Sequence, residues 1–207
     1  MPPAQLLSQD AREPLLASAG FDFTARMREL CSDVVVRSPE LAHIDLSRVA
    51  LSFCQARKRV THGLFASLTP LRFEGGALVG FRRGRQYSVQ RLYDRAGREM
   101  LYVLSFYLPR FMDLEFREKL VTVLHELWHI SPQFDGDIRR HAGRCYAHTS
   151  SQSQYDVEMG ILADRWLADG PPEGIYNFLE GSFDALHRKH GTVVGVRIPR
   201  PKLIPVR

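Results

Sequence analysis

The feature that most restricts how this chain can fold is an apolar stretch with two histidines four residues apart. The segment HELWH (residues 125–129) lies within Leu114–Ile130, where apolar side chains surround both histidines. We predict a helix from about Leu114 to Ile130, capped by Asp113 and ended by Ser131-Pro132. Residues i and i+4 share one helix face, so the two imidazoles are expected about 6 Å apart along the helix axis.

Two imidazoles on one helix face can bind one Zn²⁺ together, each at about 2.0–2.1 Å. The sequence places His125 and His129 in this way, with Glu126 beside the open side of such a metal. There a carboxylate can take a proton from a bound water, whose pKa zinc lowers to about 7. The alternative interpretation is a helix whose histidines only pack or face solvent, but buried imidazoles without partners would be costly.

A zinc ion held by two histidines needs a third protein ligand. We favour His141, twelve residues after His129, because this length of chain is sufficient to turn and return to the metal. Glu158, on a following helix, and His148, beside a Ser/Gln loop, remain alternatives. Cys145 is interpreted as a small buried residue rather than a ligand. The sequence therefore does not fix the third ligand, but it favours His141.

The site would also need a group that stabilises the oxyanion of the reaction, commonly Tyr, His or Arg. Four residues are close enough in sequence, although each has a plainer interpretation in packing or as a surface charge. They are Arg139, Tyr146, His148 and Tyr155. The apolar strand predicted over Glu99–Leu108 could offer its edge to an extended peptide.

The rest of the chain predicts one α+β domain, because strands and helices follow one another in separate runs. Residues 75–98, rich in Gly and Arg, are expected to form a long loop or irregular hairpin. Pro70 indicates an edge strand or a bend. Helices are expected over 21–36, 154–168 and 173–189, and strands over 47–56, 63–73 and 99–108.

Composition narrows the class of protein further. The chain has 207 residues, 44% of them hydrophobic, which suits one domain over 21–190 with a loose lead-in (1–20) and a basic tail (191–207). It contains neither a run long enough to span a membrane nor a secretory signal. Three scattered cysteines without a CxxC motif exclude a disulfide framework and a cysteine-built zinc ribbon. We therefore expect a reducing, cytoplasmic setting.

The residues from Phe21 to Ala168 resemble the SprT-like metalloproteases and related phage-type metallopeptidases. The best-matching pieces are residues 56–73, 101–111 and 121–148, the last containing HELWH and the later histidine. The resemblance implies a minimal zincin-like α+β domain, with a small mixed sheet packed on the HExxH helix and further helices after it. It also implies zinc ligation by His125, His129 and His141, with Glu126 as catalytic base.

Two basic stretches lie outside the metal motif. Residues 81–98 hold six arginines with interleaved aromatics, and residues 188–207 hold six Lys/Arg and no acid, in a chain of net charge +5. We favour a solvated loop and a solvated tail. The alternative is a weak nucleic-acid contact through Arg82, Arg83 and Arg85, since arginine with aromatics is typical of single-strand binding surfaces.

The sequence therefore predicts a zinc-dependent metallopeptidase that acts on a protein or peptide. The alternative is a catalytically silent zinc-binding module that contacts nucleic acid or a protein partner through its basic loop and tail. Glu126 favours the first interpretation, because a purely structural zinc site needs no general base beside it.

Overall fold

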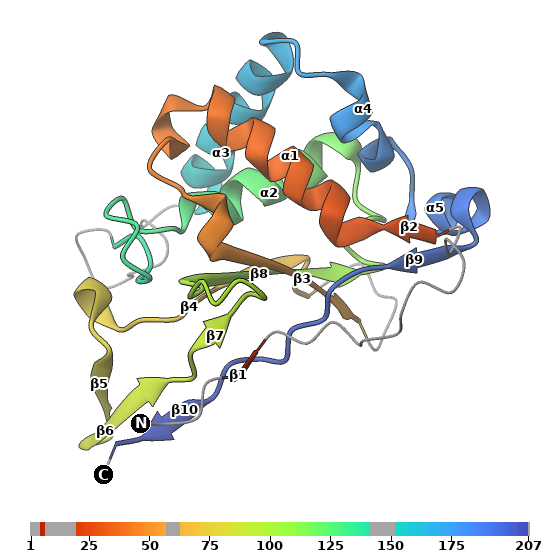
Figure 1. Cartoon of the computed structure of the whole chain (residues 1–207). Helices are drawn as coiled ribbons and strands as arrows, with labels where there is room; N and C mark the ends of the chain where they lie inside the picture. Colours follow the sequence, from red (N-terminus) through yellow and green to blue (C-terminus); the bar gives the residue numbers. More distant parts are fainter. Residues whose placement is uncertain (1–4, 7–19, 57–62, 141–151, 207) are drawn as a thin grey trace.

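The chain forms an α+β fold, described here from a computed structural model for residues 5–6, 20–56, 63–140 and 152–206 (Figure 1). A small central sheet lies beneath a layer of helices, and smaller sheets extend from its other side. Residues 1–4 and 7–19 of the predicted lead-in lie outside the described residues. No helix in the described part of the chain is both long enough and apolar enough to cross a membrane.

The central sheet is mixed and has three strands. Its order is β3 (Val49–Gln55), β8 (Tyr102–Leu108) and β4 (Ala66–Pro70), with β3 parallel and β4 antiparallel to β8. The prediction that strand 99–108 offers a free edge is wrong, because β8 is hydrogen-bonded on both sides. Its near-complete burial is the pattern of a central strand. β4 is one of the two edge strands, and Pro70 stands at its end, as predicted for an edge or bend.

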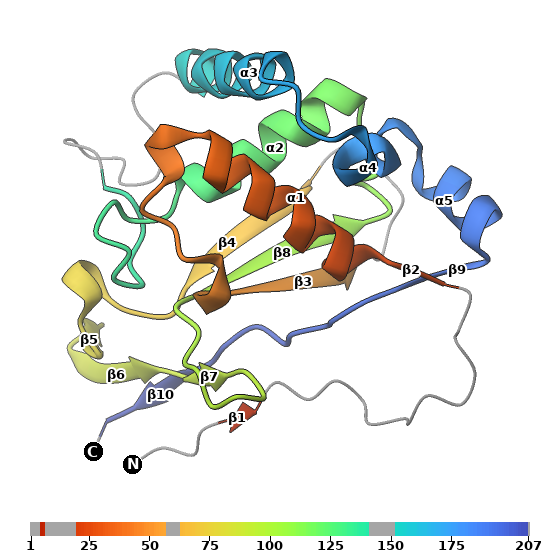
Figure 2. The same cartoon turned by 45° about the horizontal axis from the view of Figure 1, so that its top comes forward.

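Two helices, α1 (Phe23–Arg37) and α2 (Phe116–Trp128), cover one face of this sheet, and α3 (Gln152–Ala168) packs on α2 from outside (Figure 2). The core between these layers is continuous from α1 to α3. Side chains from every layer contribute to it, including Phe23, Met27, Leu104, Phe106, Leu120, Leu124 and Trp166. This packing holds α2 firmly against β4 and β8.

The start of α2 differs from the prediction. Glu115, not Asp113, is the N-cap, and Glu115 and Glu118 form a reciprocal capping box with the main-chain N–H groups of the first turn. The Asp113 side chain instead accepts a hydrogen bond from the N–H of Phe183, at 3.2 Å. Asp113 thus ties α2 to the C-terminal helices rather than capping it.

The single helix predicted over 173–189 is also wrong. The structure has α4 (Glu173–Tyr176), a 3-10 turn (Asn177–Glu180) and α5 (Phe183–His190). The chain is extended at Gly181 and Ser182, and the Ser182 side chain caps α5 by accepting from the N–H of Ala185 at 3.3 Å. A serine N-cap begins a new helix here.

The C-terminal segment runs beneath the opposite face of the sheet. It starts as β9 (Thr192–Val194), parallel to β2 (Gly20–Asp22), and its Val196 carbonyl accepts from the N–H of Phe53 at 3.0 Å. Further on, the N–H of Ile198 donates to the hydroxyl of Ser52 at 2.9 Å. This part of the predicted tail is therefore anchored to β3.

The same segment ends in β10 (Leu203–Pro205), which pairs with β6 (Arg85–Val89). β6 also pairs with β5 (Val79–Arg82), so the hairpin expected within residues 75–98 is present. Near it, β7 (Leu92–Tyr93) pairs with β1 (Gln5–Leu6). The three-stranded sheet β10-β6-β5 extends away from the helices at the lower left of Figure 1.

Candidate functional site

The two histidines of the HELWH segment lie side by side at the end of α2. His125 is in the last turn, and His129 is the C-cap, still in helical conformation with φ −66° and ψ −15°. Their ring centroids are 4.6 Å apart and the rings are nearly perpendicular, at 79°. Both side chains are partly exposed, whereas Leu124 and Leu127 on either side of His125 are buried. The pair therefore has the donors and the proximity to share one metal ion.

Glu126 points from α2 to the edge of β4 that no other described strand covers. Its Oε2 accepts a hydrogen bond from the N–H of Leu68 at 2.7 Å. Phe65 and Leu71 form main-chain hydrogen bonds with Tyr107 of β8 and with Leu101 just before it, so the alternate residues Ala66 and Leu68 turn their N–H and C=O groups away from the sheet. The carboxylate thus stands between the helix and an open strand edge.

Burial governs the acidity of this carboxyl group. Desolvation raises the pKa of Glu126 to about 7, and the hydrogen bond from Leu68, which favours the charged form, opposes this rise only in part. A carboxyl group poised near neutrality can both accept and return a proton at physiological pH. This is the behaviour required of a general base that later acts as an acid.

The segment after α2 folds back along the helix end. Tyr102 of β8 fixes this turn, because its hydroxyl donates to the carbonyl of Asp137 and accepts from the N–H of Gly136, both at 2.9 Å. Ile130 and Ile138 then form an antiparallel bridge. Gly136 has φ +90°, and a side chain there would collide with Arg72.

Arg139 brings the returning chain to the histidines. Its N–H donates to the carbonyl of His129 at 2.7 Å, and its Nε donates to the carbonyl of Trp128 at 2.7 Å. The guanidinium also stacks 4.1 Å above the Trp128 ring. Arg139, one of the candidates for oxyanion stabilisation, is therefore fixed at the end of α2 by these contacts.

The structure separates the other candidates. Glu158 is exposed on α3, and no group of three His, Cys, Asp or Glu side chains able to hold a metal ion occurs among the described residues. Glu158 is thus not brought to the histidine pair. His141, Cys145, Tyr146 and His148 lie outside the described residues, as does the side chain of Tyr155.

Comparison of the chain with protein-family models, curated proteins and solved structures finds no match.

One part of the site was missed by the sequence analysis. The contact between Glu126 and the main chain of Leu68 joins residues 58 positions apart. A main-chain donor carries no side-chain signature, so only the fold reveals that β4, and not β8, supplies the open edge beside the carboxylate.

Proposed function

We propose that this protein is a zinc-dependent metallopeptidase whose reaction centre is formed by His125, Glu126 and His129. The observation that supports this most strongly is the position of the HELWH segment. Its two imidazoles lie 4.6 Å apart, and the glutamate between them reaches the open edge of β4. Two potential zinc ligands, a potential base and a strand edge thus adjoin one another.

His125 and His129 would hold the metal, which supplies a water of lowered pKa and polarises the substrate carbonyl. Glu126 takes the proton of that water and gives it to the nitrogen of the leaving amine. The main chain of Ala66 and the C=O of Leu68 face outward and could pair with an extended peptide, so recognition would depend mainly on the substrate's backbone. A small zincin-like arrangement and a cytoplasmic location belong to the same proposal.

Hydrolysis of an unfolded protein tests the proposal. The zinc-loaded chain should cleave it, a chelator should stop cleavage, and added zinc should restore it. Absence of cleavage by fully zinc-loaded protein, over a range of unfolded substrates, would favour the catalytically silent module instead.

The third ligand is proposed to be His141. Arg139, two positions before His141 in the sequence, donates its N–H to the carbonyl of His129, which supports this choice. We expect His141→Ala to weaken zinc affinity severely and Glu158→Ala to leave it near the parent value. Competition with a chromogenic zinc chelator measures both. The reverse pattern would assign the site to a carboxylate on α3.

A second role, contact with nucleic acid, is favoured by one observation. The pairing of β10 with β6 joins the two basic stretches into one unit, here called the basic sheet (β5, β6 and β10). Residues 78–89 and 200–206 contain five Arg/Lys and no Asp or Glu. Phe81, with 74% of its surface exposed, lies next to Arg82. Arginines beside an exposed ring can bind phosphates and stack a base.

We expect Arg82→Glu/Arg85→Glu to weaken binding of a labelled single-stranded oligonucleotide at low salt, because each neutralised phosphate releases a counterion. Arg83 is left unchanged, since it occupies the hairpin turn with φ +49°. The matched control is Arg188→Glu/Lys189→Glu, the same charge change on exposed residues of α5. Equal loss in both variants, or no binding by the parent, would leave the basic sheet as a solvated surface.

A further inference from the structure

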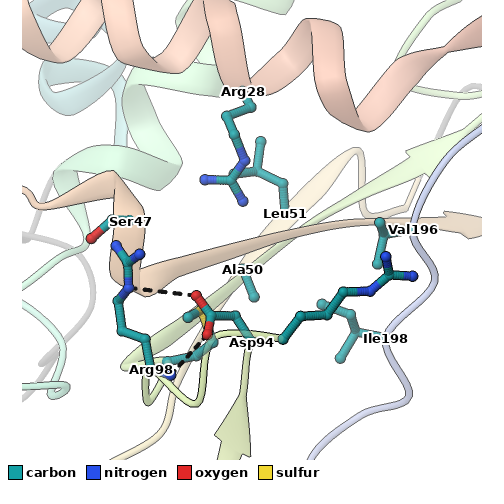
Figure 3. Close-up of a pocket in the computed structure, with 10 residues that line it drawn as sticks. Arg28, Ser47, Ala50, Leu51, Asp94, Arg98, Val196 and Ile198 are labelled. Atoms are coloured by element: carbon teal, nitrogen blue, oxygen red, sulfur yellow. Dashed lines mark hydrogen bonds and ion pairs between the residues drawn. The ribbon is translucent and has the colours of Figure 1, made fainter. Parts of the chain in front are cut away.

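A cavity of about 370 Å³ lies beside β3 (Figure 3), at the opposite edge of the central sheet from β4. It is bounded above by α1, at its back by β3, below by the turn at residues 94–98, and at the side by the C-terminal segment. Its size falls in the range of small-molecule sites. Apolar side chains form much of its wall, namely Ala50, Leu51, Met100, Val196 and Ile198.

The outer edge of β3 is interrupted at this cavity. On one side the carbonyl of Val49 accepts from Arg28, at 3.2 Å, and on the other the N–H of Phe53 donates to Val196, at 3.0 Å. Both groups face away from β8, so the alternation of the strand places the N–H and C=O of Leu51 on the same side. The gap is one residue wide, which is too short to receive another strand.

Leu51 is 3% exposed, and among the described residues neither its N–H nor its C=O has a hydrogen-bond partner on this side. Buried main-chain groups are almost always paired with protein, water or a ligand. The edge therefore presents one donor and one acceptor, next to each other and flanked by apolar side chains.

Three arginines give the cavity a positive charge. Arg28 is held in place by the carbonyls of Leu46, at 2.9 Å, and Val49. Asp94 is the one acid among the described residues of the wall. Its Oδ1 accepts from the N–H groups of Ala96 and Arg98, at 2.9 and 2.8 Å, and is thus already bonded within its own turn. The Nε of Arg98 lies 3.4 Å from the Oδ2 of Asp94, so these two side chains form an ion pair.

Arg95 is exposed, and no described residue pairs with it. A guanidinium with free donors at the mouth of a cavity can bind phosphate oxygens through two parallel hydrogen bonds. Since Asp94 offsets at most one of the three cations, the cavity favours an anion.

We propose that this cavity binds a nucleotide. A flat base would fit between the apolar side chains and pair its donor–acceptor edge with the N–H and C=O of Leu51. The phosphate would lie at the mouth, against Arg95 and Arg98. A bare phosphate would leave the Leu51 groups unpaired, and an uncharged nucleoside would leave the arginines unused. The site is independent of the proposed zinc centre, since the three strands of the central sheet lie between them.

Isothermal titration of the full chain tests this with AMP, adenosine and inorganic phosphate as probes. AMP should bind at least about tenfold more tightly than either other probe, because only AMP can use both the Leu51 edge and the arginines. Comparison with the phosphorylated dinucleotide pApA shows whether the natural ligand is a free nucleotide or the end of a nucleic-acid strand. A site for free nucleotides should bind AMP more tightly, and a site for a strand terminus should bind pApA more tightly.

Two variants locate the binding. Arg95→Ala should weaken AMP by about tenfold through loss of charge-assisted hydrogen bonds, and Val196→Phe should abolish binding by filling the cavity. Arg188→Ala, an exposed arginine on α5, is the control and should have no effect. Zinc content should be unchanged in all three. Failure of both AMP and pApA to bind, equal affinity for inorganic phosphate, or binding indifferent to both cavity variants would overturn the proposal.

Discussion

His125→Ala is expected to lose its zinc and, with it, the stabilisation that zinc gives the fold. The parent should hold one zinc per chain, and the variant close to none, because one remaining imidazole of the pair cannot retain the metal. Zinc at about a thousand times its Kd stabilises a protein by about 4 kcal/mol. For a domain of this size, this corresponds to a rise in Tm of roughly ten degrees. Elemental analysis and thermal unfolding with and without zinc measure both effects.

His187→Ala provides the control, since His187 is an exposed histidine on α5, away from the α2 pair. Its zinc content and its zinc-dependent Tm should match those of the parent. A parent protein that contains no zinc after expression in zinc-supplemented medium would contradict the whole account.

Glu126→Gln is expected to keep zinc and lose hydrolysis. Glutamine has nearly the same shape, and its side-chain oxygen can still accept the hydrogen bond from Leu68, but it cannot take a proton from water. Loss of a positioned general base typically costs about 10²–10⁴-fold in rate. The rate of cleavage of an unfolded protein, with zinc content checked in the same samples, measures the effect.

Glu158→Gln makes the same chemical change at an exposed carboxylate on α3 and should leave the rate unaltered. If Glu126→Gln cleaves the substrate as fast as the parent, the activity comes from a contaminant or from a mechanism without this base.

The helix with the HELWH segment could be predicted because its evidence is local. Apolar residues around 125–129 recur at helical spacing, and the i, i+4 spacing alone places the imidazoles on one face. The strands β3, β4 and β8 were also located, as their apolar runs are short and bounded by turn residues. Even so, the predicted helix is two residues longer than α2 at each end.

The break between α4 and α5 has a local cause, the N-cap Ser182, but the other errors concern partners that are distant in the sequence. Asp113 has the side chain of an N-cap, but it bonds instead to Phe183, seventy positions away. The order of the sheet decides that β8 is central, and no local pattern fixes that order. The same holds for the pairing of β6 with β10, which joins the two basic stretches, and for the gap at Leu51 between Arg28 and Val196.

A crystal structure of the zinc-loaded chain tests the central claim most directly. The account predicts one zinc ion bound by His125, His129 and His141, with a water as fourth ligand within about 2.6–3.2 Å of the Glu126 carboxylate. A zinc ion bound by four protein side chains and no water would contradict it. So would a zinc ion bound elsewhere while no metal is held by His125 and His129.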